Sequence, residues 1–446
     1  MRCFVLVFLA ACGGPSGAVP DAGSVSDAAS ESVSVSDSAP DAVSDSDSGP
    51  VCTRAAQAAT APATLYDALV ADLKSLQSAQ IPAREDQFIA DVKAQGGTPL
   101  EDAGDRLVFV ERGAPPQGPW SVAGSFTNWK ASALPMTLVP GTTDLYVLDA
   151  HVARGVAQPY KLLSGTDDTG FAEDLLARNV VWDGINHDAP GFFNAIAHAS
   201  DGDASKGRIV RHHTVHATKL GDDRDVFVYL PPKYDDGSCA AVPQIVFHDG
   251  NESLTRGDFA TVADTTYASN ASSQAALVFV ALSDQNVRTN EYTFGTQGAL
   301  GDDYGDFLVN DLEPIISQTY RVCSKAGSRG IAGASLGGLI STYLAFQRPD
   351  VWGFVGAQSA SYFWDDNAMI TRAGQDPVVP VRFYLDTGCP DGADNCTVVQ
   401  QVRDALEAKS YDVTYVEDDT AQHDWPYWAA RLPKLLTDFP STSPCN

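Results

Sequence analysis

The sequence is short of basic residues. Its 446 residues contain 29 Lys and Arg against 57 Asp and Glu, which gives a formal net charge of −28. Phosphate backbones and anionic lipid headgroups repel so acidic a chain, which argues against nucleic acid or a charged membrane surface as a partner. The hydrophobic fraction of 44% and the aromatic fraction of 9% are those of a globular protein, and the length allows two or three domains.

Zinc-type ligand spacing is also missing. The eight cysteines include no Cys-x-x-Cys pair and no neighbouring Cys/His cluster. His212, His213 and His216 lie close together in the sequence, but no set of acidic ligands accompanies them. We therefore expect no metal and no other cofactor.

The N-terminus lacks an apolar run long enough to cross a bilayer. In "MRCFVLVFLAACGG" one arginine precedes about ten apolar residues, whereas a spanning helix needs roughly 20. This pattern is typical of an export signal. Because Leu9-Ala10-Ala11-Cys12 matches the bacterial lipobox, we predict a lipoprotein signal peptide over residues 1–12 and lipidation at Cys12. The alternative is an ordinary signal peptide with an incidental cysteine.

Lysine, arginine and aromatic residues are absent from the next stretch, Asp21 to Pro50. Its Ser, Asp, Ala and Val cannot bury enough apolar surface to offset the entropy of ordering. Residues 13–52 are therefore predicted to be a solvated tether. The expected localisation is that of an exported bacterial lipoprotein, at the outer membrane, in the periplasm or on the cell surface, with the lipid as its membrane anchor.

The remaining chain changes its pattern twice. Apolar residues at helical spacing predict a helical segment over 63–101 that packs with the N-terminal module, and short alternating runs over 102–205 predict an all-β sandwich. From 206 to 446, buried strands alternate with helices, which predicts a mainly parallel α/β sheet covered on both faces. Trp120 and Trp129 could form a sugar-stacking platform, but packing within the sandwich is the favoured interpretation.

A candidate nucleophile lies in the second half. "IAGASLGGLIS" places Ser335 in a Gly-x-Ser-x-Gly pattern between an apolar strand and a helix. In that context the serine occupies a sharp turn at the carboxyl edge of the sheet, with a helix N-terminus beneath it. A serine needs a base, and His423 is the one histidine that follows Ser335 in the sequence.

Three aspartates are candidates for the acid that orients the base. Asp391 follows the end of a strand by a short turn and is our preferred choice, with Asp394 and Asp386 as alternatives. The oxyanion hole is expected to use two backbone N–H groups. One belongs to Leu336, which follows the nucleophile, and the other to Asn251 in the "FHDGNES" loop.

An even number of cysteines remains after Cys3 and Cys12, which in an exported chain suggests disulfides. Cys52 and Cys445 could tie the ends of the folded region together, and Cys389 and Cys396 flank a short loop. Cys239 and Cys323 each precede one of two strands that are neighbours in α/β-hydrolases. We therefore predict that these two form a bridge at the edge of the sheet away from the nucleophile.

The C-terminal half resembles the enterochelin esterase and esterase D-type esterase family. Segments that carry the resemblance include "VYLPPKY", "FHDG", "VRTNEY", "IAGASLGGLISTYLAFQRPDVWG", "AQSASYFW", "GCPD" and "HDWPYW". "AGSFTNWK" and the alternating runs after it are similar to the early-set, immunoglobulin-like modules that precede enterochelin esterases. The implied fold is an α/β-hydrolase domain behind an immunoglobulin-like sandwich.

The resemblance also implies residue roles. Ser335 matches the family nucleophile and His423 its base, Asp391 with Gly388 matches the Gly-x-x-acid pattern, and Arg288 with Glu291 matches an Arg-x-x-Glu pair expected at the pocket rim. The implied activity is hydrolysis of a carboxylic ester, on a small molecule or linked to a polysaccharide, through an acyl-enzyme. A glycan-binding lipoprotein with an inert hydrolase domain, or an acyltransferase with the same triad, are the alternatives.

Overall fold

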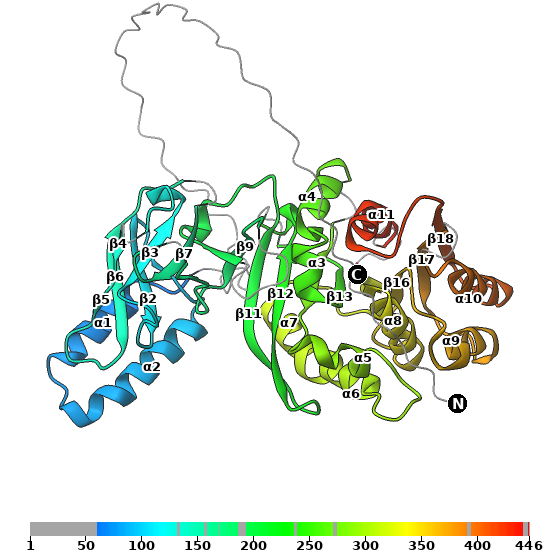
Figure 1. The fold of residues 1–446 in the computed structure, drawn as a ribbon, viewed down its shortest axis with the longest axis horizontal. Coiled ribbons are helices and arrows are strands. Elements are labelled where there is room, and N and C mark those ends of the chain that lie inside the picture. Colours follow the sequence, from blue (N-terminus) through cyan, green and yellow to red (C-terminus); the bar gives the residue numbers. More distant parts are fainter. Residues whose placement is uncertain are drawn as a thin grey trace, which may run out of the picture. The chain divides into compact units, whose positions relative to one another are not determined.

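The computed structural model describes residues 60–131, 134–155, 158–167, 169–185, 193–235, 239–270, 274–389 and 394–439, together with Cys445 (Figure 1). The predicted signal, Cys12, the tether and Cys52 lie outside the described residues. Within the described part of the chain, no helix is long and apolar enough to cross a membrane.

Two helices and a small sheet begin the described chain. The helices are α1 (Thr64–Leu73) and α2 (Ile81–Ala94). The sheet has the strand order β1-β2-β6-β5, with the bounds β1 Leu100–Glu101, β2 Arg106–Arg112, β5 Thr137–Leu138 and β6 Leu145–His151.

Strand β2 is buried on both of its faces because its side chains alternate between two cores. Val108 and Val110 pack with Leu69 of α1 and with Phe88 and Val92 of α2, among others. Leu107 and Phe109 point the other way and pack with Val122 and Leu162, which belong to a second sheet. The helices therefore cover one face of the small sheet, and the second sheet covers its other face.

The second sheet runs without a break from the N-terminal part into the C-terminal part. Its N-terminal strands are β3 Trp120–Gly124, β4 Leu134–Pro135, β7 Pro159–Ser164, β8 Phe171–Ala172, β9 Asn179–Trp182 and β10 Phe193–Ile196. Strand β9 pairs antiparallel with β11 (Arg208–Ala217), with Val180 opposite Ile209. The boundary predicted near residue 205 is thus crossed by backbone hydrogen bonds, a continuity that the sequence pattern did not indicate.

Trp120 does not present a sugar platform. Its side chain packs in the core between the two sheets, only 7% of the residue is exposed, and its Nε1–H donates to the carbonyl of Gly113 over 2.9 Å. The Trp129 ring lies edge-on to Phe171, with ring centroids 6.2 Å apart. The assignment of these sheets to the early-set modules remains a prediction.

The C-terminal part is the predicted α/β sheet. Its strand order is β18-β17-β16-β15-β13-β14-β12-β11, and the pairs from β14 to β18 are parallel. The strands are β12 Asp222–Leu230, β13 Gln244–Phe247, β14 Ala276–Val280, β15 Arg329–Ala334, β16 Phe354–Gln358, β17 Arg382–Gly388 and β18 Val413–Asp418. The helices are α3 Gly250–Thr255, α4 Phe259–Ser269, α5 Arg288–Glu291, α6 Gly301–Asp306, α7 Glu313–Thr319, α8 Leu336–Gln347, α9 Trp364–Gln375, α10 Cys396–Ala408 and α11 Trp425–Asp438, with a π-helical turn over Phe307–Leu312.

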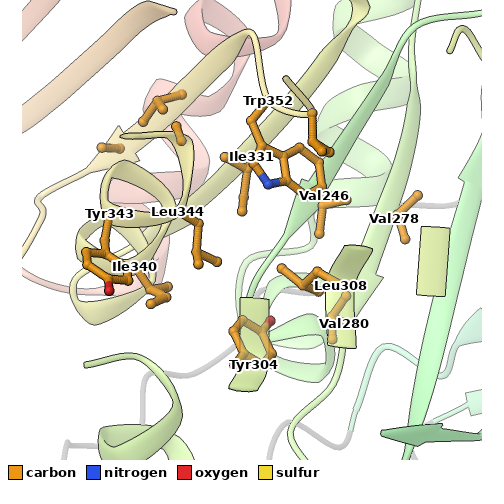
Figure 2. Packing of buried hydrophobic residues seen from close by; sticks show 14 of the residues in the cluster. Val246, Val278, Val280, Tyr304, Leu308, Ile331, Ile340, Tyr343, Leu344 and Trp352 are labelled. Atoms are coloured by element: carbon orange, nitrogen blue, oxygen red, sulfur yellow. The ribbon is translucent and has the colours of Figure 1, made fainter. Parts of the chain in front are cut away.

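Alternating side chains bury both faces of this sheet, which confirms the prediction. Val246, Val278, Val280 and Ile331 face one core, where they pack with residues of the π-helical turn and of α8 (Figure 2). Their neighbours on the same strands face the opposite core, formed with α4 and α11. The continuous apolar strands of the sequence are therefore a consequence of double coverage.

The disulfide predicted at the edge away from the nucleophile has a different partner. Cys323 bonds to Cys445, with the two Cα atoms 5.2 Å apart, and does not bond to Cys239, which is itself disulfide-bonded. Cys445 lies close to the start of β13, where its Sγ is 3.2 Å from the carbonyl of Ala241. The Cys239–Cys323 and Cys52–Cys445 pairings suggested by the sequence are therefore both wrong, because Cys323 and Cys445 bond to each other.

Candidate active site

Ser335 lies at the predicted turn between β15 and α8. Its backbone has φ 60° and ψ −122°, a strained conformation for a residue with a side chain, and its N–H donates to the carbonyl of Gln358 over 2.9 Å. The flanking glycines permit this turn: a Cβ at Gly333 would lie 2.9 Å from the backbone of Gly337, and one at Gly338 would lie 2.8 Å from the Cβ of Ala360. The small residues of the motif are thus required by close strand-helix packing.

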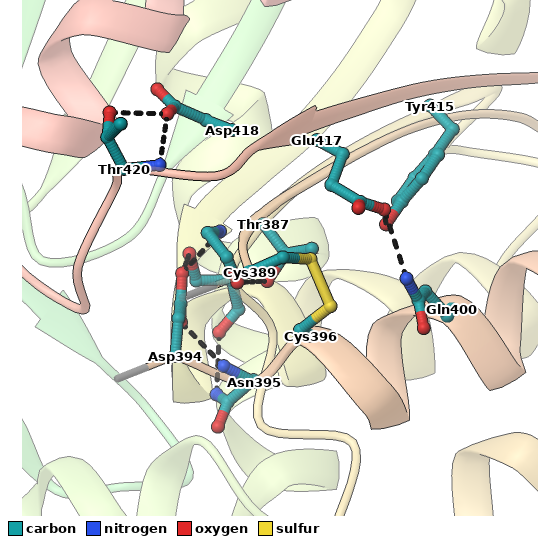
Figure 3. Close-up of a disulfide and its surroundings, with 12 residues drawn as sticks. Thr387, Cys389, Asp394, Asn395, Cys396, Gln400, Tyr415, Glu417, Asp418 and Thr420 are labelled. Atoms are coloured by element: carbon teal, nitrogen blue, oxygen red, sulfur yellow. Dashed lines mark hydrogen bonds between the residues drawn. A yellow bond between two sulfur atoms is a disulfide. The ribbon is translucent and has the colours of Figure 1, made fainter. Parts of the chain in front are cut away.

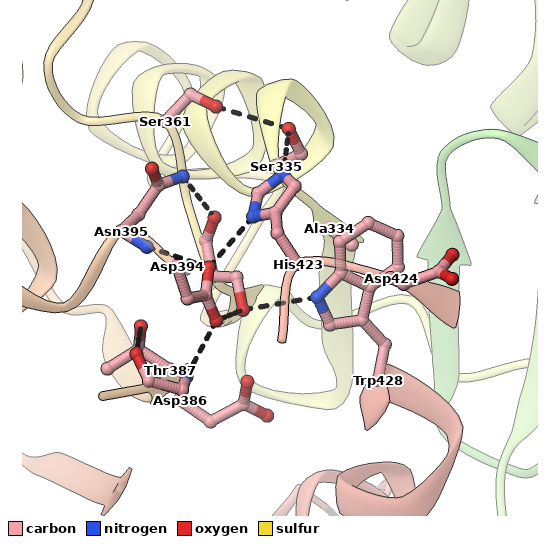
Figure 4. Close-up of polar contacts among 12 residues, drawn as sticks. Ala334, Ser335, Ser361, Asp386, Thr387, Asp394, Asn395, His423, Asp424 and Trp428 are labelled. Atoms are coloured by element: carbon pink, nitrogen blue, oxygen red, sulfur yellow. Dashed lines mark hydrogen bonds and ion pairs between the residues drawn. The ribbon is translucent and has the colours of Figure 1, made fainter. Parts of the chain in front are cut away.

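Three side chains form a hydrogen-bonded chain at this edge of the sheet (Figure 4). His423 Nε2 lies 2.9 Å from Ser335 Oγ, and His423 Nδ1 lies 2.8 Å from Asp394 Oδ1. An ionised carboxylate can only accept, so the Nδ1–H donates to Asp394 and the Nε2 lone pair faces the serine hydroxyl. The imidazole packs edge-on against Trp428, with ring centroids 5.1 Å apart.

The acid partner is Asp394, which corrects our preference for Asp391. Asp391 lies outside the described residues, and the carboxylate that bonds His423 belongs to Asp394, one of the two alternatives. The Cys389–Cys396 disulfide, which confirms that predicted pair, closes the loop after β17 and brings the residues just before α10 back to the end of that strand (Figure 3). Gly388 at the strand end then donates its N–H to Asp394 Oδ2 over 2.6 Å.

The Asp394 carboxylate is buried and fully bonded. Its side chain has no exposed surface, and besides His423 it accepts from the N–H of Asn395 and of Gly388 and from the hydroxyl of Ser359, over 2.6–2.7 Å. Burial raises the pKa of Asp394, but the hydrogen bonds from His423, Ser359 and the two backbone N–H groups outweigh it and lower the pKa below 3.8 overall. The group therefore remains ionised at neutral pH.

A second layer orients Ser359 toward the acid, and our sequence reasoning missed it. Ser359 Oγ accepts from Trp428 Nε1 over 3.1 Å and from Arg431 Nη2 over 3.0 Å, which leaves its own proton for Asp394. Arg431 in turn donates its Nε–H to Asp386 over 2.8 Å. Asp386, the other alternative acid, is therefore engaged in positioning. Ser359 directly follows β16, and Asp386 of β17 lies opposite Gln358, the last residue of β16. This common edge of parallel strands was the available signal.

Both predicted oxyanion donors lie at helix starts. Leu336 is the first residue of α8 and Asn251 the second of α3, so their N–H groups belong to first turns, which lack intrahelical acceptors. The two starts are in contact, since a Cβ at Gly337 would lie 3.4 Å from the Cβ of His248 and 3.5 Å from Asp249 Oδ2. The Leu336 N–H directly follows Ser335, and Asn251 belongs to the helix start that approaches α8, as two donors for a developing negative charge would require.

Arg288 and Glu291 do not form a rim pair. Arg288 holds the turn before α3 through a bidentate ion pair with Asp249, with N–O distances of 2.7 and 2.8 Å. Glu291 is only 1% exposed and pairs with Arg224 of β12 over 2.8 Å. The rim prediction is therefore wrong for Glu291, which is buried structure, and Arg288 supports the turn that carries Asn251.

No group in the described part of the chain is suited to hold a metal. The one cluster with suitable spacing there is Cys389, Cys396 and Glu417, and both of its sulfurs are consumed by the disulfide. The three histidines of β11 bond to separate partners: His212 to the Tyr320 hydroxyl, His213 to Asp225 and His216 to Asp223. A bulge between His212 and Val215 further separates their directions.

Comparison with known proteins gives one family. Residues 217–439 match the model of the Esterase family, described as "Putative esterase". The uncharacterized protein YbbA of Bacillus subtilis (strain 168) is 26% identical over 223 residues, which cover 46% of this chain and 84% of that protein. The endo-1,4-beta-xylanase/feruloyl esterase of Xylanibacter ruminicola is 22% identical over 148 residues, 33% of this chain and 19% of that protein.

Solved structures with a similar chain trace include two esterases. The enterobactin esterase from Shigella flexneri superposes with a TM-score of 0.45 and 16% identity, over 76% of this chain and 94% of that one. A ferulic acid esterase superposes with a TM-score of 0.45 and 20% identity, over 52% of this chain and 98% of that one.

Proposed function

The chain belongs to the Esterase family and is a carboxylic ester hydrolase, and from this we propose that it cleaves its ester through a Ser335-His423-Asp394 triad and an acyl-enzyme. The observation that carries this proposal is the hydrogen-bonded chain from Ser335 Oγ through the imidazole to the buried carboxylate.

In the acylation step, His423 Nε2 takes the hydroxyl proton as Ser335 Oγ attacks the ester carbonyl carbon. The negative charge moves to the carbonyl oxygen, where the N–H groups of Leu336 and Asn251 stabilise it. Asp394 stabilises the imidazolium. Collapse of the intermediate breaks the C–O bond, and the leaving alkoxide takes the proton from His423 as the alcohol.

Deacylation repeats these roles with water. His423 takes a proton from a water molecule that attacks the acyl-serine, and returns it to Ser335 Oγ as the acid product leaves. Transfer of the acyl group to another alcohol would use the same groups. Hydrolysis and transfer are distinguished by product analysis with a competing alcohol present.

The test is hydrolysis of a short-chain chromogenic ester by the wild-type chain and by Ser335→Ala and His423→Ala variants. We expect both substitutions to abolish turnover with little change in the melting temperature. Ser75→Ala and His151→Ala remove the same groups outside this site and serve as matched controls. Turnover in the Ser335→Ala variant equal to wild type would refute the proposal.

We propose feruloyl esters and catecholate lactones as the first natural substrates to compare. The feruloyl ester is suggested by the xylanase/feruloyl esterase relative, and the lactone by the sequence resemblance to enterochelin esterases. Export as a lipoprotein remains our proposal and favours an extracellular ester. Incorporation of labelled palmitate in cells, lost in a Cys12→Ala variant, would support it.

We also propose that the N-terminal sheets are an early-set, immunoglobulin-like module. Two sheets that share the core around Phe109 and Val122 support this assignment. A glycan-binding role gains no support from Trp120, because its ring is buried.

A further inference from the structure

The single helical turn α5 places two side chains against the turn that precedes α3. Arg288 begins α5 and Tyr292 follows its last residue, and the Tyr292 N–H donates to the Arg288 carbonyl over 3.0 Å. Residues four apart on a helical turn lie on the same face. The Arg288 guanidinium accordingly lies over the Tyr292 ring, 5.3 Å from its centroid. The segment "VRTNEY" of the sequence therefore presents these two side chains together.

Both side chains bond to Asp249, the residue before α3. The Tyr292 hydroxyl accepts from the Asp249 N–H over 3.0 Å, and the Arg288 guanidinium donates to both carboxylate oxygens over 2.7 and 2.8 Å. Asp249 and Tyr292 are buried, so water does not compete for the bond between them. The backbone of Asp249 and its side chain are thus both held from α5.

Asp249 needs these bonds because of its backbone conformation. It has φ 53° and ψ 50°, in the left-handed region that a residue with a Cβ adopts at a cost. At the next residue, Gly250, a Cβ would lie 2.7 Å from the backbone carbon of Val280, so the turn packs tightly on the end of β14. Asn251, the proposed second oxyanion donor, follows directly. The groups that fix Asp249 therefore also fix the direction of the Asn251 N–H.

The Arg288 guanidinium also reaches the other half of the site. Its Nη2 lies 3.5 Å from the carbonyl oxygen of Ala334, the residue before Ser335. A Cβ at Gly337, in the first turn of α8, would lie 3.5 Å from the Asp249 carboxylate. One guanidinium thus contacts both turns that lead into the proposed oxyanion donors. Such donors stabilise an oxyanion only when they point at the same oxygen, so their relative placement matters for the rate.

We propose that Arg288 and Tyr292 are positioning residues for the oxyanion hole. Through Asp249 they fix the N–H of Asn251 relative to the N–H of Leu336. This role rests on the proposed function, since an oxyanion forms only if the serine attacks an ester. Loss of either side chain should weaken the stabilisation of the tetrahedral intermediate, which lowers kcat, and should leave binding of the ground-state ester, and with it KM, nearly unchanged.

The test measures kcat and KM of the full chain on a short-chain chromogenic ester for Tyr292→Phe, which removes only the oxygen that accepts the Asp249 N–H. Tyr234→Phe is the matched control, because the buried Tyr234 hydroxyl also accepts a backbone N–H over 3.0 Å, that of Arg321. We expect Tyr292→Phe to lower kcat about 10- to 30-fold, less than the roughly 10²- to 10³-fold typical of removing an oxyanion donor outright. Tyr234→Phe should keep the wild-type kcat, and melting temperatures show whether both variants fold.

A second pair of variants tests the guanidinium. Arg288→Lys keeps the positive charge but loses the planar fork that bonds both oxygens of Asp249. Arg208→Lys is its control, because Arg208 bonds both oxygens of Asp235 over 2.7 and 3.3 Å and its side chain is 25% exposed, as that of Arg288 is. We expect kcat to fall in Arg288→Lys and to stay at the wild-type value in Arg208→Lys.

Inhibition by a trifluoromethyl ketone supplies a readout that a merely structural role would not change. Addition of Ser335 Oγ to its carbonyl gives a hemiketal whose oxyanion occupies the oxyanion hole. Its Ki should therefore rise in Tyr292→Phe by about the factor by which kcat falls, as expected for a transition-state analogue. The matching methyl ketone, which binds as the ketone, should inhibit the wild type and the variant equally.

A wild-type kcat and Ki in Tyr292→Phe, or an equal loss of kcat in Tyr234→Phe, would overturn the positioning role. The proposed function would still stand if the wild type hydrolyses the ester and Ser335→Ala does not, whereas no turnover in the wild type would overturn both. A fall in kcat with a matched rise in Ki in Tyr292→Phe, together with a lower kcat in Arg288→Lys and not in either control, would establish the role.

Discussion

An Asp394→Asn substitution tests which aspartate acts with His423. The structure places Asp394 beside His423, whereas the sequence favoured Asp391. Asp394 Oδ1 accepts from His423 Nδ1 and from the N–H of Asn395, and Oδ2 accepts from the Ser359 hydroxyl and from the N–H of Gly388. Each oxygen therefore faces one backbone N–H that cannot reorient. An amide NH₂ at either position is opposed by a donor, at a cost of about 1–3 kcal/mol in stability.

The effect on catalysis is larger than the effect on stability. With the NH₂ at the Oδ1 position, His423 must accept at Nδ1, which puts its proton on Nε2, where it cannot take the proton of Ser335. With the NH₂ at Oδ2, the tautomer survives but the negative charge that stabilises the imidazolium is lost. We expect kcat to fall about 10³- to 10⁴-fold, which corresponds to about 4–5.5 kcal/mol of barrier.

The assay is kcat on a short-chain chromogenic ester, measured with the melting temperature for Asp394→Asn and for Asp391→Asn as its matched control. The control should keep the wild-type kcat. Equal losses in the two variants, or a wild-type kcat in Asp394→Asn, would refute the assignment of Asp394 as the acid.

Three further perturbations test the structure. Glu291→Gln should cost about 2–3 kcal/mol in the free energy of unfolding, because the buried Arg224 loses its ion-pair partner, and should leave kcat nearly unchanged, because Glu291 does not contact the substrate. A raised KM with unchanged stability would instead support a position at the pocket rim. Replacing both Cys389 and Cys396 by serine should lower the free energy of unfolding by about 2.5 kcal/mol, because the loop constraint is lost, and should also lower kcat, because the loop holds Asp394. Chemical denaturation and kinetics in the same buffer measure the two effects. An unchanged kcat would show that the disulfide does not position Asp394. Burial, and next the charge of Asp174, raise the pKa of Glu111 from 4.5 to about 8. Between these pH values the folded state binds one more proton than the unfolded state, so the free energy of unfolding should fall as pH rises from 4.5 to 8. Glu111→Gln should remove this pH dependence of the melting temperature, and an unchanged dependence would show that another group causes it.

The proposed nucleophile and the proposed base could be predicted from the sequence because their signals are local or unique. The turn at Ser335 needs glycines where strand and helix approach, so the motif itself contains its geometry. His423 is the one histidine that follows it. The double coverage of the sheet also follows from short-range information, because continuous apolar strands have no polar face to expose.

The acid, the disulfide partners and the role of Glu291 were decided by the tertiary structure. Three aspartates lie between positions 386 and 394, and only the closed loop after β17 determines which carboxylate reaches His423. Cys323 pairs with Cys445, 122 residues later in the sequence, and Glu291 is buried because Arg224 lies opposite it, 67 residues earlier in the sequence. Hydrogen bonds and ion pairs of this kind depend on distances of a few ångströms between remote segments. Those distances are set by the packing of the whole sheet, so residue type and spacing alone leave them open.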